Sequence, residues 1–206
     1  MSQTRSMGAA RLSSESRQTQ IVEAVLKLSA EHSPGLITTQ EIADAIGVTQ
    51  GAIFRHFPNK EAMLLATIGR VEEDLLGKLE TAAQGANTPL EGLQRVFFAH
   101  IDFVVQTPGV PRLIFNELQQ AADSPVKMGV RRMLERYRRL LMSLLGAGIA
   151  AGEIRADLDA GAAATLFIGT NQGLVMQSML ANNTAAIRVA AEAVFPLFLR
   201  GIQEQA

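Results

Sequence analysis

The segment Thr38–Phe57 constrains the fold more than any other part of the chain, because it combines two short apolar-faced stretches with a glycine between them. Ala43 is small enough to let a second helix cross the first, and Gly47, four residues later, tolerates a left-handed backbone. Val48 and Ile53 have the spacing needed to fill the angle between the two helices. This spacing predicts a helix-turn-helix.

Helical periodicity also dominates the rest of the sequence, which is 48% hydrophobic. The pair Thr38 and Glu41 has the spacing of a capping box, and Thr88–Glu91 adds a proline at the first helical position. Ser124 and Asp159 are further candidate N-caps. The sequence therefore predicts an all-α protein of about nine helices, with an N-terminal three-helix helix-turn-helix domain and a C-terminal helical domain.

The composition changes near residue 60, from short helices with glycine turns to long apolar helices. We expect a disordered arm over residues 1–16, a helix-turn-helix domain over 17–62, and a helical domain for dimerisation and effector binding over 63–206. The arm is polar and contains two arginines, so a solvated tail and a phosphate-contacting arm both remain open.

The stretch Ile21–Leu64 resembles the DNA-binding domain of the TetR family of bacterial transcriptional regulators. Outside this stretch the resemblance extends only to length and helix number. The positions that carry it are Thr39, Ile42, Ala43, Gly47, Val48, Thr49, Phe54, Phe57, Lys60, Glu61 and Met63 or Leu64. The resemblance implies a homodimer that binds a palindromic operator in double-stranded DNA and releases it when a small hydrophobic effector binds. It also implies a cytoplasmic protein, most often a repressor.

A recognition helix over Gln50–Phe57 would enter the major groove with its N-terminal residues toward the bases. Glutamine can pair with adenine through two hydrogen bonds, and a threonine methyl can contact a thymine methyl. Free amides at the start of a helix bind phosphate well. The predicted DNA-binding residues are Thr38, Thr39, Thr49, Gln50, Gly51, Phe54, Arg55, His56 and Lys60.

Each of these residues also has a simpler interpretation. The two threonines before the first helix can act only as caps, and Gln50, Arg55 and His56 can be ordinary surface side chains. Phe54 stands where the family often has tyrosine, and phenylalanine cannot donate a hydrogen bond to phosphate. Residues 1–62 contain six basic and six acidic side chains. Affinity for DNA must therefore come from the placement of charges and from dimer geometry, and we expect a modest salt dependence.

The last two predicted helices, Asp159–Ala181 and Thr184–Ile202, are nearly uncharged and are the predicted dimer interface, as they are in the family. Their simpler role is that of core helices. The predicted effector site combines apolar side chains with polar groups in apolar surroundings, although each of these residues could equally pack in the core. Its members are Phe98, Ile101, Phe115, Asn116, Tyr137, Phe167, Asn171 and Gln172.

Several other classes of protein find little support in the sequence. The chain has no cysteine and three scattered histidines, and it has no nucleophile elbow, P-loop or dinucleotide-binding turn. We therefore expect no enzyme activity, cofactor or metal. The uncharged stretch 160–187 carries too many amide and hydroxyl side chains to predict a membrane span. The remaining alternatives are an effector-independent DNA binder in division or nucleoid control, and a helical protein-interaction module.

Overall fold

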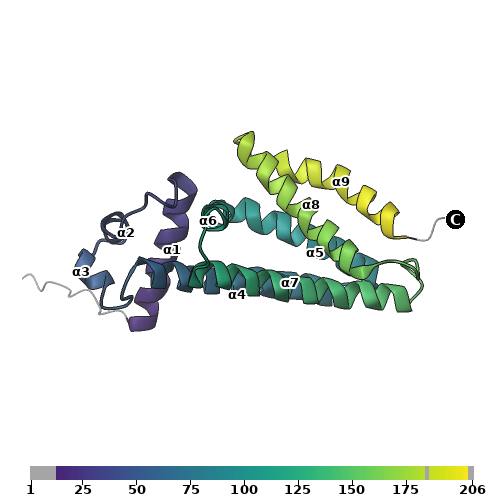
Figure 1. The fold of residues 1–206 in the computed structure, drawn as a ribbon, viewed down its shortest axis with the longest axis horizontal. Coiled ribbons are helices and arrows are strands. Elements are labelled where there is room, and N and C mark those ends of the chain that lie inside the picture. Colours follow the sequence, from purple (N-terminus) through teal and green to yellow (C-terminus); the bar gives the residue numbers. More distant parts are fainter. Residues whose placement is uncertain (1–12, 184–185, 204–206) are drawn as a thin grey trace, which may run out of the picture.

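The structure is a computed structural model that describes residues 13–183 and 186–203. Within these ranges it contains nine α-helices and no strand, which confirms the predicted fold class (Figure 1). The helices are α1 (Ser14–Glu31), α2 (Thr39–Ala45), α3 (Gln50–Ile53), α4 (Lys60–Gln84), α5 (Pro89–Gln106), α6 (Gly109–Leu118), α7 (Pro125–Ala150), α8 (Ala160–Leu180) and α9 (Ala186–Ile202).

Helices α1, α2 and α3 form a small unit at one end of an elongated molecule (Figure 1). Their apolar faces, together with the start of α4, enclose a core that is separate from the main one. Ile21, Ala43 and Ile53 are completely buried at its centre. We call α1–α3 and the first turn of α4 the reading unit.

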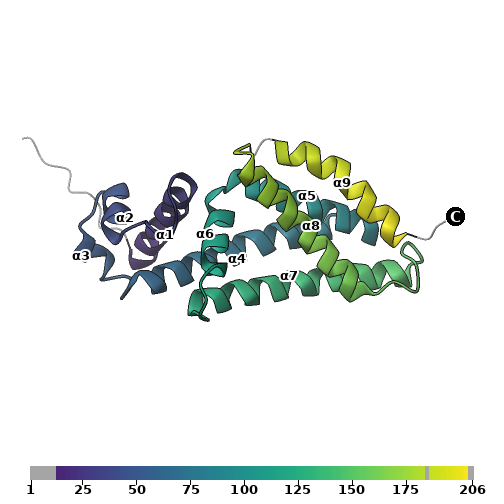
Figure 2. The same cartoon turned by 45° about the horizontal axis from the view of Figure 1, so that its top comes forward.

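Helices α4 to α9 form the larger part of the molecule, which we call the body. The long helices α4 and α7 pack against each other along its length, and α5 packs against both (Figures 1 and 2). Helices α8 and α9 pack against each other on the outer side of α5. The core contains a group of packed aromatic rings in which Phe167 meets Phe97 and Phe198 edge to face and Phe195 is tilted against Phe97. None of the helices in the described ranges has the length and apolar character needed to cross a membrane.

The predicted helix starts are confirmed by hydrogen bonds to the backbone. The side chains of Thr38, Thr88, Ser124 and Asp159 each accept a bond from an amide in the first turn of the helix that follows. Thr38 and Glu41 form the complete capping box. These bonds satisfy amides that a helix start leaves without an intrahelical partner.

Two boundaries differ from the predictions. Helix α1 begins at Ser14, inside the range predicted for the arm, because Ser13 caps it by accepting from the amide of Ser16. Residues 1–12 of the predicted arm lie outside the described residues. The recognition helix, predicted over Gln50–Phe57, is α-helical only over Gln50–Ile53 and continues as hydrogen-bonded turns before Pro58.

Helix α6 joins the reading unit to the body. It lies between α1 and the body helices, and packs against α1 on one side and α7 on the other (Figure 2). At its first residue, Gly109, the backbones of α6 and α1 are so close that an added Cβ would overlap the carbonyl oxygen of Leu26. Only glycine permits this approach, so Gly109 fixes the distance between the two parts.

Candidate nucleic-acid interface and effector pocket

The turn between α2 and α3 has the geometry that the sequence predicts. Gly47 has a φ of 67°, in the left-handed region that disfavours other residues. The amide of Val48 donates to the carbonyl of Ala43, which closes the turn, and Thr49 caps α3 by accepting from the amide of Ala52. These bonds set the direction in which α3 leaves the unit.

Five of the predicted DNA-binding residues form one exposed surface along α3 and the turn after it. Thr49, Gln50, Gly51 and Arg55 are exposed, and Phe54 leaves 45% of its surface in solvent. Arg55 has no hydrogen bond or ion pair with any described residue. A cation in the turn after a short helix, with no partner among the described residues, is available to a phosphate or a base edge. We call these five residues the reading surface.

The two threonines at the start of α2 lie next to this surface. The side-chain amide of Gln50, on α3, donates to the hydroxyl of Thr39, on α2, and this bond orients the Gln50 side chain. Thr38 donates from its amide and its hydroxyl to Glu41, over 2.7 Å and 2.8 Å. The backbone hydrogen bond from Thr38 lowers the pKa of this carboxyl group. Glu41 is therefore a fixed negative charge, and its Oε2 accepts both hydrogen bonds from Thr38.

His56 and Lys60 have internal partners. His56 Nδ1 lies 3.1 Å from the hydroxyl of Ser14, and its carbonyl accepts from Gln18, so it connects the end of α3 to α1. The ammonium group of Lys60 donates to the backbone carbonyls of Gly35 and Ile37, in the loop before α2. Partial burial lowers the pKa of Lys60. The geometry thus gives both residues a role in bracing the reading unit, which the sequence does not predict.

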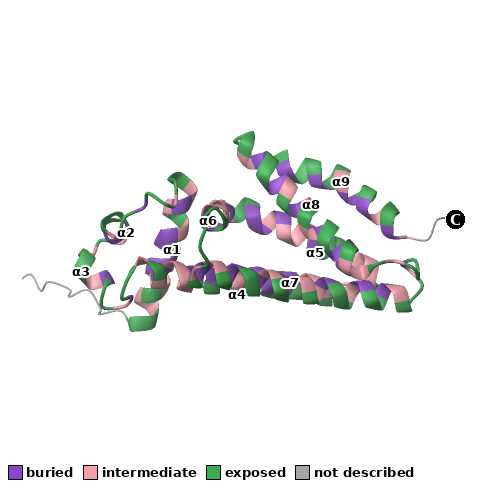
Figure 3. Cartoon of the chain, viewed as in Figure 1, coloured by how far each residue is buried: buried purple, intermediate pink, exposed green. Residues whose placement is uncertain are grey.

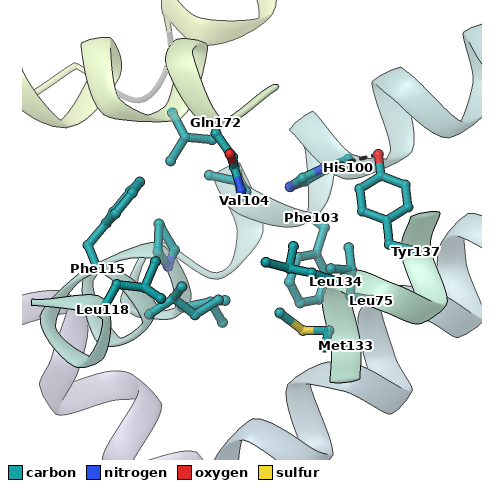
Figure 4. A pocket seen from close by; sticks show the side chains of 14 residues that line it. Leu75, His100, Phe103, Val104, Phe115, Leu118, Met133, Leu134, Tyr137 and Gln172 are labelled. Atoms are coloured by element: carbon teal, nitrogen blue, oxygen red, sulfur yellow. Dashed lines mark hydrogen bonds between the residues drawn. The ribbon is translucent and has the colours of Figure 1, made fainter. Parts of the chain in front are cut away.

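The body contains a pocket between α4, α5, α6, α7 and α8 (Figure 4). The space between its lining atoms amounts to about 670 Å³, a volume that includes solvent at its open side. Its walls are apolar except for three side chains, His100, Tyr137 and Gln172. The other lining residues are Leu75, Phe103, Val104, Val110, Pro111, Ile114, Phe115, Leu118, Met133, Leu134 and Val175.

His100 and Tyr137 form a hydrogen-bonded pair in the wall of this pocket. His100 Nδ1 lies 3.2 Å from the hydroxyl oxygen of Tyr137, and the two rings meet edge to face. Burial lowers the pKa of His100 from 6.5 to about 4, so the imidazole is neutral at physiological pH. Burial also raises the pKa of Tyr137. The pocket therefore holds uncharged polar groups in an apolar wall.

The eight predicted effector-binding residues separate into three groups. Phe115, Tyr137 and Gln172 line the pocket. Ile101, Phe167 and Asn171 are completely buried in the core, and Phe98 packs against Phe195 with the guanidinium of Arg188 over its ring. Asn116 lies at the junction with the reading unit, where its side-chain oxygen would be 3.1 Å from a Cβ added to Gly35. The last five therefore do not contribute to the wall of this pocket.

Sequence reasoning missed His100 as a pocket residue, although the sequence carries a signal for it. Phe97, Ile101 and Val104 form the buried face of α5, and His100 has the helical spacing that places it on the same face. A histidine within an otherwise apolar face is a candidate polar group in a cavity. No cluster of potential metal ligands occurs among the residues that the structure describes.

Helices α8 and α9 have many exposed positions (Figure 3), and several of these carry large apolar side chains. Leu180 leaves 80% of its surface in solvent and Val189 leaves 70%, and Leu166, Met176 and Leu197 are also exposed. The other face of each helix is buried against the core. Both helices thus carry apolar side chains on two sides, a pattern typical of helices that contact another protein surface.

Two sequence models of known families match the chain. Residues 21–67 match that of the bacterial regulatory proteins of the tetR family, and residues 116–194 match that of the tetracyclin repressor-like C-terminal domain. The first match covers the reading unit and the second covers much of the body. Neither description is that of an enzyme family.

Individual relatives agree with these matches. The nucleoid occlusion factor SlmA of Actinobacillus pleuropneumoniae is 30% identical over 120 residues, which span 58% of this chain and 59% of that protein. The transcriptional repressor KstR2 of Mycolicibacterium smegmatis is 25% identical over 70% of each chain. The crystal structure of the regulator FadR from Bacillus subtilis in complex with stearoyl-CoA has a TM-score of 0.80 at 24% identity, covering 90% of this chain and 99% of that one. At this identity the structural likeness shows the shared fold.

Proposed function

Because the chain belongs to the tetR family of bacterial regulatory proteins, we propose that it is a transcriptional regulator, most simply a repressor, that binds a palindromic operator as a dimer and leaves it when a small hydrophobic effector binds. The observation that carries this proposal is the reading surface. It presents Gln50 at the start of α3, a glycine that lets the backbone approach DNA, and the unpaired cation Arg55. Such a surface fits the major groove.

Dimerisation is part of the proposal because one short helix reads few bases. Two copies related by a twofold axis read two half-sites about 34–36 Å apart. The exposed apolar faces of α8 and α9 support an interface at these helices, since they form the largest group of uncovered apolar side chains on neighbouring helices. A self-complementary apolar patch is what a twofold dimer requires.

The effector would act through α6. One side of this helix lines the pocket with Val110, Ile114 and Phe115, and its first residue, Gly109, contacts the backbone of α1. A ligand that separates α6 from α7 must therefore move α6 against the reading unit or strain the pocket wall. If the displaced arrangement binds ligand better, occupancy shifts the population away from the DNA-binding arrangement.

The proposal is tested by measuring affinity for a duplex selected from a randomised pool, in wild type and in two matched variants. Gln50→Ala removes a base-reading side chain and should weaken binding about 10-fold or more, because a bidentate base contact contributes about 1–3 kcal/mol. Gln94→Ala removes an exposed glutamine from α5, in the body, and should change nothing. Equal affinities for the two variants would exclude the reading surface as the DNA site.

The likeness to SlmA favours a second candidate, a DNA-binding protein of the same fold that acts in nucleoid or division control without a ligand. Genome-wide occupancy separates the two functions. Binding at a few promoters supports a ligand-responsive regulator, whereas dozens of scattered sites support the alternative. The apolar pocket beside α6 favours the first, because a ligand-independent protein has no need for a cavity at its domain junction.

A further inference from the structure

The effector pocket has no charged side chain in its wall, which restricts the ligands it can accept. Of its fourteen lining residues, eleven are apolar and the remaining three are His100, Tyr137 and Gln172. Burying an ionised group without a partner of opposite charge is strongly unfavourable. A ligand enclosed by this wall must therefore leave any charge outside.

The hydrogen bond between His100 and Tyr137 determines what the imidazole offers to a ligand. The Tyr137 hydroxyl is buried, and among the described residues its hydrogen-bond partner is His100 Nδ1. A buried hydroxyl satisfies its proton by donating it, so Nδ1 accepts and the proton of the neutral ring resides on Nε2. Figure 4 shows this second ring nitrogen directed away from Tyr137, into the cavity. The pocket therefore presents one N–H donor from a fixed ring.

From this geometry we propose that the effector is an uncharged, mainly hydrocarbon molecule with an acceptor oxygen, such as a ketone, ester or lactone, which binds His100 Nε2–H. In this arrangement His100 is a ligand-binding residue, and Tyr137 is a positioning residue that holds the ring in the donating tautomer. Gln172, at the exposed side of the pocket on α8, can meet a second polar group of the ligand. The proposal rests on the proposed function, because it names the ligand class of the same site.

A cation that could attract an anionic ligand lies nearby but outside this wall. Arg112 lines a neighbouring crevice, which shares Val104 and Pro111 with the pocket. A carboxylate or phosphate ligand would use that guanidinium and leave His100 without a role. The two ligand classes thus make different predictions for the same side chains.

Three small probes with one skeleton distinguish these classes. The probes are 4-phenylbutan-2-one, butylbenzene and 3-phenylpropanoate, which place a ketone, a hydrocarbon and a carboxylate at the same position. Dissociation constants are measured by NMR titration of the full-length protein labelled with ¹⁵N-histidine, without DNA. We expect the ketone to bind about fivefold more tightly than butylbenzene, as one neutral hydrogen bond allows, and to shift the His100 Nε2 resonance. The carboxylate should bind most weakly.

Two variants and a control test the residue assignment. His100→Leu should abolish the preference for the ketone over butylbenzene. Tyr137→Phe keeps the shape of the pocket but frees the tautomer, so the preference should fall and the ¹⁵N spectrum should show both nitrogens sharing the proton. His32→Gln removes an exposed histidine outside the pocket and should leave all three affinities unchanged. Because Tyr137→Phe removes a single oxygen, the test does not depend on whether His100→Leu folds.

Each outcome decides the proposal. A ketone preference that disappears in His100→Leu and falls in Tyr137→Phe supports it. It is overturned if butylbenzene binds as tightly as the ketone, if the carboxylate binds best, or if none of the probes perturbs the protein. A failure of the proposed function itself would appear elsewhere, as the absence of sequence-specific DNA binding in the protein without probe.

Discussion

The reading unit and the body of this protein carry their functions in opposite ways. In the reading unit, the side chains proposed to contact DNA are exposed, and the buried ones only hold three helices at fixed angles. In the body, the surfaces to which we assign functions are apolar: a pocket wall and the outer faces of α8 and α9. In the reading unit, a sequence pattern can distinguish the exposed DNA-contact candidates from the core residues, because the two sets differ in polarity. In the body, the pocket and interface candidates are of the same apolar residue types as the core.

The forces that hold the two parts together differ as well. The reading unit depends on local rules, namely a capping box, a left-handed glycine and a second N-cap within twelve residues. The body depends on contacts between residues distant in sequence, such as the aromatic rings of α5, α8 and α9. Local rules can be read from a sequence, whereas contacts between distant segments cannot. The predictions below compare these two kinds of constraint, from the largest expected effect to the smallest.

A substitution at the contact between α1 of the reading unit and α6 of the body should lower stability the most. In Gly109→Ala the new methyl group overlaps the Leu26 carbonyl oxygen, which belongs to the backbone and cannot turn aside. We expect a loss of about 3 kcal/mol in the free energy of unfolding, at the upper end for overpacking. Gly146→Ala, in α7 where nothing surrounds the new methyl group, should instead stabilise by about 0.5–1 kcal/mol. Urea denaturation measures both, and similar values for the two variants would contradict the close approach of α6 and α1.

The pocket should make the stability of the body depend on pH. The folded-state pKa of His100 is about 4, below its ordinary value of 6.5, so the unfolded chain binds more protons between these values. The free energy of unfolding should therefore fall as the pH drops from about 6.5 to 4, by up to about 1.4 kcal/mol per pH unit. Chemical denaturation across this range measures the slope. The slope of the free energy of unfolding against pH should flatten in His100→Leu but not in His32→Gln. An equal slope in wild type and both variants would show that a group other than His100 is responsible for it.

The sequence predicts the fold class, the helix-turn-helix and the helix caps, because each depends on residues a few positions apart. It predicts DNA contacts at positions that are exposed along α3 and the turn after it. It also assigns Lys60 to phosphate, but a pattern cannot show that its ammonium group turns back to the carbonyls of Gly35 and Ile37. In the body it places three of eight effector residues in the pocket. Phe167 and Phe115 look alike in sequence, and only packing puts one in the core and the other at the cavity.

Two left-handed glycines compare backbone strain in the two parts. Gly47 in the reading unit and Gly152 after α7 have φ values of 67° and 72°, and neither has an atom within 4 Å of an added Cβ. Alanine at either position should therefore cost about 1–2 kcal/mol of stability from the backbone alone. Only Gly47→Ala should also weaken DNA binding, because its turn sets the direction of α3. Equal losses of DNA affinity in the two variants would show that the Gly47 turn has no particular role in orienting α3 for DNA binding.

The smallest expected effect separates two cations of the reading unit, Arg55 and Lys60. Arg55→Ala should reduce the slope of log affinity against log salt by about 1, as the loss of one phosphate contact predicts. Lys60→Met should reduce it less and instead lower stability, because its ammonium group already donates to two carbonyls. Fluorescence anisotropy at several salt concentrations measures both slopes. A larger change for Lys60 than for Arg55 would reverse the roles inferred from their hydrogen bonds.

The central claim is that two reading surfaces, held by one dimer, recognise DNA together. It is tested most directly by selecting duplexes from a randomised pool at about 0.1 M salt and sequencing those that bind. The account predicts two inverted half-sites with centres about 34–36 Å apart, and the loss of their joint enrichment in Leu166→Glu, which places a charge on the exposed face of α8. Enrichment of a single unrepeated site, of no sequence, or of the same palindrome by the Leu166→Glu variant as a monomer would contradict it.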